Sequence, residues 1–277
     1  MFQTRLHHRA LWFGSFEHWD LFRIWITRAG GYPEFRICFV KRLVVIPARY
    51  GATRLPGKPL LDIAGKSLIR RVYEAARQSK LADEVLVATD DERIRSAASD
   101  FGAFAVMTSP DCPSGTDRVF EAVKQRDADI VVNVQGDEPL IRGDMIDLLF
   151  AAFEEEPVEM ATLCCPLTDD AEFRNPNVVK VVLDGNGFAL YFSRSQIPFV
   201  RRATGMPIYK HIGIYGFSRS FLETFVTLPR GKLEETESLE QLRALEAGRR
   251  IKTLIVDYDG ISIDTPEDLE RARLMRR

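Results

Sequence analysis

The segment 47–60, PARYGATRLPGKPL, combines cationic side chains with residues that interrupt regular structure. It follows the apolar run LVVI and carries Arg49, Arg54 and Lys58 among glycines and prolines. Glycines let a backbone approach an anion closely, and arginine and lysine donate charge-assisted hydrogen bonds to phosphate oxygens. Cations this close repel one another by up to ~1 kcal/mol per pair unless an anion joins them. The pattern predicts a site for a triphosphate; a solvated surface loop is the alternative.

The spacing within this loop excludes the common phosphate-binding motifs. From Gly51 to the pair Gly57 and Lys58 there are five intervening residues. The Walker A loop requires four and then a hydroxyl, where this chain has Pro59. The segment AGKS at 64–67 contains Gly-Lys-Ser but has Leu60 where the motif requires its first glycine, and no G-x-G-x-x-G follows any predicted strand. The chain is therefore predicted to be neither a P-loop NTPase nor a dinucleotide-binding protein of the common type.

Acidic residues follow another apolar run, in VVNVQGDEPLI at 131–141. Asp137 is well suited to bind Mg²⁺, a hard cation that needs only one or two protein carboxylates when substrate phosphates supply further oxygens. Asp264, between a short strand and the last predicted helix, is a second candidate ligand. The structural alternative is that Asp137 or Glu138, and likewise Asp264, caps the helix that follows it.

The elements that must position these residues alternate between strand and helix from Arg42 onward. This order predicts a parallel sheet covered on both faces, with strands buried on both sides. Ligands of such sheets bind beyond the carboxyl ends of the strands, where the cationic loop and Asp137 both lie. The predicted strands are 42–46, 84–89, 103–107 and 129–134, and the predicted helices are 67–79, 91–102, 116–126 and 143–156.

After Pro157 the pattern changes to strands that suit antiparallel pairing. The runs MATLCCPL, VVKVVLD and FALYFSRS predict strands, and DGNG at 184–187 predicts a hairpin turn between the last two. A final helix is predicted over 265–276, where a threonine, a proline and acidic residues suit a helix start.

Composition narrows the class of protein. The chain of 277 residues is 45% hydrophobic and 28% charged, which is typical of a globular protein with a sizeable core. A net charge of −2 gives no bulk attraction to nucleic acid or to an anionic membrane. The four cysteines lack metal-binding or disulfide-framework spacing, and no apolar run reaches the ~18 residues of a membrane span. A reduced, cytoplasmic setting is expected.

Residues 1–41 differ from the rest of the chain. They hold all three tryptophans and three of the four histidines, with many arginines and few acids. A targeting peptide lacks support because there is no clean apolar region with a cleavage site. We expect an extension that is disordered or arises from a wrongly assigned start codon, followed by one domain over 42–277.

Several motifs in order resemble the 3-deoxy-manno-octulosonate (KDO) cytidylyltransferases, also called CMP-KDO synthetases. The resemblance extends from about Leu43 to the C-terminus, and the ordered set is specific although single motifs are shared more widely. The motifs are PARYGATRLPGKPL, SGTDR, NVQGDEP, NPNVVKVV, ALYFSRSQIP, KHIGIYGF, LEQLR and DTPEDLERAR.

This resemblance implies an α/β, Rossmann-like nucleotidyltransferase fold with a mostly parallel central sheet and an added antiparallel dimerisation portion. It also implies a homodimer that uses Mg²⁺, CTP and KDO. The family transfers CMP from CTP to the 2-hydroxyl of KDO with release of pyrophosphate, which activates KDO for lipopolysaccharide synthesis in the cytoplasm. Partners such as nucleic acid or a membrane are not expected.

The same resemblance assigns roles to residues of this chain. Arg49, Arg54 and Lys58 would bind the CTP phosphates, Ser114 and Gly115 would lie against the cytosine, and Asp137 and Asp264 would hold the metal. Arg49, Lys58 and the two acids form the predicted catalytic set. Arg201 is matched less firmly, because its segment is shorter than in many relatives and Arg202 could replace it. The predicted sugar-acid residues are Gln135, Arg194, Arg201, His211, Tyr215 and Glu240.

The sequence is compatible with other roles. His211 alone is more typical of a core histidine, and only the resemblance favours a ligand contact. A cytidylyltransferase for 8-amino-KDO or an acylneuraminate would carry the same loop and acids, and so would a non-catalytic nucleotide-binding relative. The metal used in the cell is not predicted.

Overall fold

The computed structural model describes residues 22–29, 32–51, 55–260, 262–263 and 265–275, of which 22–29, 32–39 and 275 by backbone only. Contacts divide the chain into two compact units, 1–41 and 42–277. In the first unit, β1 (Phe22–Ala29) and β2 (Tyr32–Phe39) form an antiparallel hairpin, to which the sequence had assigned no element. The origin of this first unit stays a prediction.

A parallel core lies at the centre of the second unit. β3 (Arg42–Ala48) pairs in parallel with β6 (Glu84–Thr89) on one side and with β8 (Ile130–Val134) on the other. β7 (Phe104–Met107) extends the sheet beyond β6, again in parallel. This confirms the predicted α/β fold with a mostly parallel central sheet.

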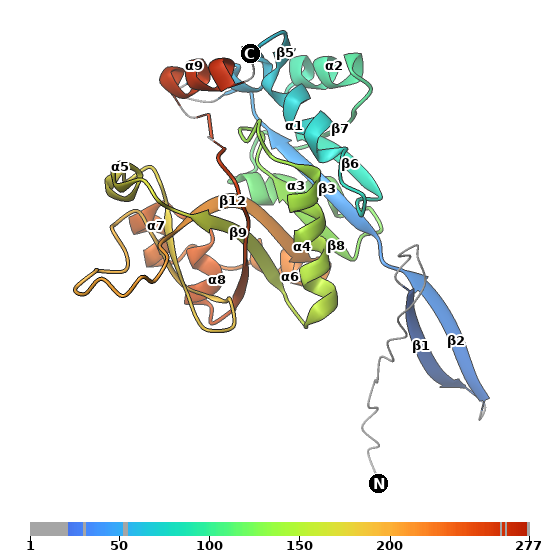
Figure 1. The fold of residues 1–277 in the computed structure, drawn as a ribbon. Helices are drawn as coiled ribbons and strands as arrows, with labels where there is room; N and C mark the ends of the chain where they lie inside the picture. The colour runs from blue at the N-terminus through green and yellow to red at the C-terminus, as the bar shows by residue number, and fades with distance from the viewer. Residues whose placement is uncertain (1–21, 30–31, 52–54, 261, 264, 276–277) are drawn as a thin grey trace. The chain divides into compact units, whose positions relative to one another are not determined.

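Antiparallel strands continue the sheet beyond β8. The long β12 (Tyr209–Ser218) pairs antiparallel with β8, β9 (Met160–Pro166) and β10 (Lys180–Leu183), with a register shift between Ile212 and Tyr215. β10 and β11 (Ala189–Ser193) form the predicted hairpin, and β13 (Ile251–Ile255) pairs in parallel with β9. Figure 1 shows β9 and β12 side by side.

Helices cover the sheet. α1 (Leu68–Ala76) and α4 (Gly143–Glu155) contact each other as well as strands of the sheet, and Figure 1 shows α4 lying across it. A separate apolar cluster joins Leu43 and Val45 to α3 (Gly115–Val123), α6 (Arg219–Phe225) and α8 (Leu242–Glu246). The remaining elements are the 3₁₀ helix Lys58–Leu60, β4 (Asp62–Ile63), β5 (Lys66–Ser67), α2 (Glu92–Asp100), α5 (Asp170–Arg174), α7 (Lys232–Glu237) and α9 (Pro266–Met275).

One close approach between helices depends on a missing side chain. A Cβ on Gly143, the first residue of α4, would lie 2.4 Å from the backbone carbon of Gln78, just beyond α1. Any other residue would push the two helices apart, because real Cβ atoms do not come this near to backbone.

The four parallel strands, the helices between them and the final helix were predicted within a few residues. The expectation that all four strands are buried on both faces was wrong for β7, whose Phe104 is 56% exposed because β7 is an edge strand. β12, β13 and the short helices α5 to α8 were not predicted, since they are short or interrupted by glycine. Within the described chain, no helix is both long and apolar enough to cross a membrane.

Candidate active site

The cationic loop begins where β3 ends and closes on itself at its described ends. The amide of Gly57 donates to the carbonyl of Tyr50 at 3.0 Å, and Gly57 takes a φ of 69°, which favours glycine. The guanidinium carbon of Arg93 lies 3.3 Å from the centre of the Tyr50 ring, which holds that ring from outside the loop. Arg49 is exposed at the start of the loop, and Arg54 lies outside the described residues.

Lys58 and Asp137, which the sequence placed on separate loops, meet in the structure. Nζ of Lys58 donates to Oδ2 of Asp137 at 2.7 Å, and their side chains are 13% and 27% exposed. The carbonyl of Asp137 accepts from the amide of Ile263 at 3.0 Å, so the chain just before position 264 runs beside it. Asp264 itself lies outside the described residues.

Glu138, the acid next to Asp137, is held in a different environment. It is 7% exposed, and its Oε2 accepts from the hydroxyl of Tyr258 at 2.9 Å. Burial, followed by the negative charge of Glu138, raises the pKa of Tyr258 above its ordinary value. The neighbouring acids therefore differ, since Glu138 is buried in the core and Asp137 faces a cation at the sheet edge.

Ser114 and Gly115, predicted to meet the cytosine, lie at the start of α3. Oγ of Ser114 accepts from the amide of Asp117 at 3.1 Å and donates to the carboxylate of Asp117 at 2.6 Å. Ser114 is thus the N-cap of this helix. A Cβ on Gly115 would lie 3.7 Å from Oε1 of Gln135, so the predicted cytosine and sugar-acid residues are neighbours here.

The sequence did not single out Arg118, which fastens α3 to the strands beside it. Its side chain is fully buried, and Nη2 donates to Oδ2 of Asp90 at 2.7 Å while Nη1 donates to the hydroxyl of Thr108. Asp90 directly follows β6 and Thr108 directly follows β7. This contact positions the N-terminal turns of α3 against the carboxyl ends of two strands.

His211 and Tyr215 lie on β12, on either side of Gly213, where an added Cβ would lie 3.9 Å from Cγ of Gln135. The two rings have centroids 5.4 Å apart, and Nε2 of His211 lies 2.9 Å from the hydroxyl oxygen of Thr162. Burial lowers the pKa of His211 to about 3 and keeps its ring neutral at physiological pH. The hydroxyl of Tyr215 donates to Oε1 of Gln241 at 3.0 Å, and burial raises its pKa.

Glu240 enters this region from the turn before α8. Its Oε2 accepts from the hydroxyl of Thr116 at 2.6 Å, and Thr116 in turn accepts from Nδ2 of Asn133 at 3.2 Å. Oδ1 of Asn133 accepts from Nε2 of Gln135 at 3.4 Å. Sequence reasoning missed Thr116 and Asn133, although a polar residue inside the apolar strand IVVNV signals a partnered buried side chain.

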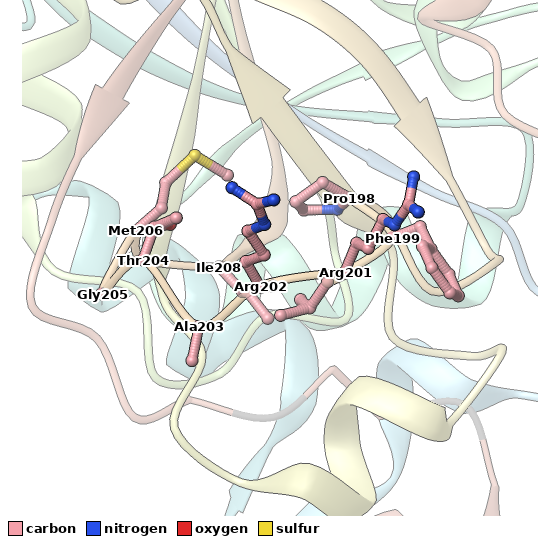
Figure 2. A pocket seen from close by; sticks show the side chains of 10 residues that line it. Pro198, Phe199, Arg201, Arg202, Ala203, Thr204, Gly205, Met206 and Ile208 are labelled. Carbon is pink, nitrogen blue, oxygen red and sulfur yellow. The ribbon is translucent and has the colours of Figure 1, made fainter.

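Two predicted arginines are placed differently. Arg194 donates to the backbone carbonyls of Glu237, Pro176 and Ser238, which occupies three of its five N–H groups. Arg201 lies on the loop 198–208, which supplies all of the described residues that line a hollow of about 650 Å³. Figure 2 shows the side chains of Arg201 and Arg202 on this loop, and no other predicted site residue is among the described residues of the lining. A sugar-acid contact for either predicted arginine stays a prediction.

The buried thiols are unsuited to nucleophilic chemistry. Burial raises the pKa of Cys164 to about 12 and that of Cys165 to about 11. Burial, helped by a hydrogen bond to Glu121, raises the pKa of Cys112 to about 11. These three cysteines are free thiols, and because the thiolate is the reactive form, they are inert at neutral pH.

Comparison with known proteins identifies the family. The cytidylyltransferase family model matches residues 43–251. A 3-deoxy-manno-octulosonate cytidylyltransferase from Thermodesulfovibrio yellowstonii is 52% identical over 244 residues, covering 83% of this chain and 96% of the relative. An 8-amino-3,8-dideoxy-manno-octulosonate cytidylyltransferase from Shewanella baltica is 50% identical, covering 82% of this chain and 95% of the relative.

Solved structures agree. The structure of a CMP:2-keto-3-deoxy-manno-octonic acid synthetase complexed with CTP matches with a TM-score of 0.82 and 47% identity, covering 85% of this chain and 98% of that one. A cytidylyltransferase from Leptospira borgpetersenii matches with a TM-score of 0.56 at 22% identity, which shows the shared fold alone. The chain therefore belongs to the cytidylyltransferase family, as a nucleotidyltransferase related to the KDO and 8-amino-KDO cytidylyltransferases.

Proposed function

We propose that this protein transfers CMP from CTP to the 2-hydroxyl of KDO and releases pyrophosphate. The hydroxyl oxygen forms a bond to the α-phosphorus, the bond from that phosphorus to the oxygen bridging to the β-phosphorus breaks, and the hydroxyl proton is lost. The ion pair between Lys58 and Asp137 is the observation that supports the proposal, because it brings a cation predicted to bind phosphate next to an acid at the carboxyl edge of the sheet. The similarity to KDO cytidylyltransferases supports the choice of substrate.

In this mechanism the residues of the chain mostly bind and orient. Phosphoryl transfer of this kind depends on alignment of the attacking oxygen and on stabilisation of the charge that develops. Arg49, Arg54 and Lys58 neutralise the triphosphate, and the capped start of α3 orients the base. Because His211 stays neutral and contacts Thr162, it acts in the site as an uncharged hydrogen-bonding group.

Mg²⁺ belongs to the same proposal, with Asp137 and Asp264 as its protein ligands. Asp137 fits a cation, since its carboxylate lies 2.7 Å from the ammonium group of Lys58. Carboxylate oxygens are the ligands that this hard ion prefers. The bound ion would supply neutralisation of phosphate charge and polarisation of the phosphoryl oxygens.

A pyrophosphate-release assay tests the substrate. The protein is incubated with CTP and Mg²⁺ together with KDO, 8-amino-KDO or an acylneuraminate, and with ATP in place of CTP as a control. We expect release with CTP and KDO. Release with another acid but none with KDO would overturn the assignment of the sugar acid, and no release with any acid would overturn the activity.

A specific observation favours 8-amino-KDO as the second candidate. The relatives from Shewanella that carry this substrate in their names are about as similar to the chain as the KDO enzyme is, at 50% against 52% identity. The ratio of kcat/KM for the two acids decides between them, because specificity is a difference in transition-state binding.

The proposal includes a homodimer in the cytoplasm that supplies activated KDO for lipopolysaccharide. Large apolar side chains are exposed on the loop 198–208, among them Phe199 at 87% and Met206 at 56%, and Leu190 on β11 is 60% exposed. Large apolar side chains exposed to this extent typically mark contact surfaces where they adjoin one another, as Phe199 and Val200 do along the chain. Light scattering coupled to gel filtration measures the assembly, and a monomer at micromolar concentration would overturn this part.

A further inference from the structure

A relay of hydrogen bonds links two predicted sugar-acid residues through two residues with no assigned role. Gln135 lies at one end and Glu240 at the other, and Asn133 and Thr116 connect them. Both connecting side chains are buried, with Asn133 0% and Thr116 1% exposed. Polar groups buried this deeply must satisfy one another, so their hydrogen bonds are constrained in direction as well as in position.

The carboxylate of Glu240 determines which group donates and which accepts in each hydrogen bond of the relay. An ionised carboxylate only accepts hydrogen bonds, so the Thr116 hydroxyl must donate to it at 2.6 Å. Because its only hydrogen is used in that bond, the Thr116 hydroxyl accepts a hydrogen bond from Nδ2 of Asn133. The carbonyl oxygen of Asn133 then faces Gln135 and accepts from its Nε2.

Two acceptor atoms remain at the two ends of the relay without a hydrogen bond from the described residues. Oε1 of Gln135 accepts no hydrogen bond from any residue that the structure describes. Oε1 of Glu240 is buried, likewise without a hydrogen-bond partner in the described part of the chain, although Nη2 of Arg243 lies 3.7 Å away and stabilises the negative charge. Because Oε1 of Glu240 is closed off from solvent and Gln135 is only partly buried, the Gln135 end is the one that can meet a hydrogen donor such as a hydroxyl group of a polyhydroxylated ligand.

We propose that Thr116 and Asn133 are positioning residues that transmit the charge of Glu240 to the amide of Gln135 and turn its carbonyl oxygen toward the hydroxyl groups of the sugar acid. The inference rests on the proposed function, and it deepens it by assigning the selection for hydroxyl donors to residues outside the predicted site. Thr116 directly follows Gly115, so the relay also connects the predicted nucleotide site to the predicted sugar-acid site.

The variant Thr116→Val removes the hydroxyl and keeps the shape of the side chain. With the relay broken, the Gln135 amide is free to turn, and we expect KM for the sugar acid to rise about tenfold, the equivalent of one charge-assisted hydrogen bond. KM for CTP should change less than about twofold, because the cations that bind the triphosphate are untouched. Thr116→Ser, which restores the hydroxyl, should return KM for the sugar acid to near the wild-type value.

Thr253→Val is the matched control. Thr253 is 3% exposed, and its hydroxyl has no hydrogen-bond partner among the described residues, so the change removes a buried hydroxyl outside the relay. Thermal unfolding of each variant separates loss of fold from loss of positioning. An unchanged KM for the sugar acid in folded Thr116→Val, or an equal rise in KM for both substrates, would overturn the inference.

A double-mutant cycle tests the direction of the relay. Gln135→Glu places a carboxylate against the carbonyl oxygen of Asn133, which is unfavourable while Thr116 holds Asn133 in place. In the Thr116→Val background Asn133 can turn its amide nitrogen toward the introduced carboxylate, so the same change should cost at least about threefold less in kcat/KM. Additive effects would overturn the relay, whereas a wild-type protein that turns over no sugar acid would overturn the proposed function itself.

Discussion

Nζ of Lys58 lies 2.7 Å from Oδ2 of Asp137 and joins the loop after β3 to the loop after β8. The two residues are 79 positions apart, and they meet because parallel strands end at the same edge of the sheet. A cation of the chain thus neutralises the acid that we propose as a metal ligand. The binding of nucleotide and metal must rearrange this pair, since Lys58 is also proposed to bind phosphate.

Removal of the Asp137 carboxylate should abolish turnover. For Asp137→Ala we expect kcat to fall at least about a hundredfold, because the site loses a proposed ligand of the metal that would stabilise the charge on the transferring phosphate. The midpoint of thermal unfolding should shift only slightly, since Asp137 is partly exposed and outside the core. Pyrophosphate release and circular dichroism measure the two effects.

Asp144→Ala is the control for this change. Asp144 pairs with Arg142 on the surface, with 69% of its side chain exposed, and should affect neither activity nor fold. Full activity in Asp137→Ala would show that Asp137 is not a required metal ligand. It would favour the alternative that this carboxylate has only a structural role.

Replacement of Lys58 should have opposite effects on metal and nucleotide. For Lys58→Met we expect Mn²⁺ to bind the nucleotide-free protein at least about tenfold more tightly, because the competing ammonium is gone from Asp137. With CTP, kcat/KM should fall about a hundredfold, since a phosphate contact is lost. Electron paramagnetic resonance of free Mn²⁺ measures the first effect, and Lys66→Met is the control, because Lys66 pairs with Glu74 in an exposed ion pair.

Metal affinity unchanged by Lys58→Met would mean that the ammonium and the metal use different faces of Asp137. A wild-type protein that binds Mn²⁺ tightly without nucleotide would contradict the competition directly.

The parallel core and the two halves of its edge site could be predicted from the sequence, for a physical reason. Buried strands are uniformly apolar and end in polar loops, so the run before Arg49 and the run before Asp137 mark both the strands and their carboxyl ends. The pairing of Lys58 with Asp137 could not be predicted, because it depends on the order of strands in the sheet. Strand order arises from tertiary packing, which no local pattern records.

Residues that act through others were the hardest to find. Thr116 lies inside the motif SGTDR and Asn133 inside an apolar strand, and nothing in their spacing connects them to Glu240, over a hundred positions away. Arg194 illustrates the converse, because its motif marks it as a ligand residue while its guanidinium also ties backbone carbonyls together. β12 was missed because Gly213 and Gly216 interrupt an otherwise strand-like pattern.

The stability of the protein should depend on pH through His211. Its pKa is about 3 in the folded protein against an ordinary value of 6.5, so the unfolded chain binds a proton between these values and the folded protein does not. This contribution to stability is present above pH 6.5 and is lost as the pH falls from 6.5 toward 3. In His211→Asn the free energy of unfolding should fall less steeply as the pH is lowered from 6.5 to 3. The slope should decrease by the equivalent of up to one bound proton.

Denaturant unfolding of both proteins from pH 7 to pH 4 measures this difference. Because His211 stays neutral in the folded protein, we also expect it to cause no change in kcat/KM near pH 6.5. The pH profiles of the wild type and of His211→Asn should therefore have the same shape around this pH. Parallel stability curves for the two proteins would show that His211 titrates normally.

Arg118 should carry more of the stability than any surface arginine, and some of the nucleotide affinity. Its guanidinium is fully buried against Asp90, so Arg118→Met leaves a largely buried acid unpaired and should lower the free energy of unfolding by about 3 kcal/mol. Arg95→Met, in an exposed pair with Glu92, should cost less than about 0.5 kcal/mol. Because Arg118 anchors the first turns of α3, KM for CTP should also rise in the surviving folded protein. Denaturant unfolding gives the energies, and a loss below about 1 kcal/mol would mean that Asp90 finds solvent or another partner once the guanidinium is gone.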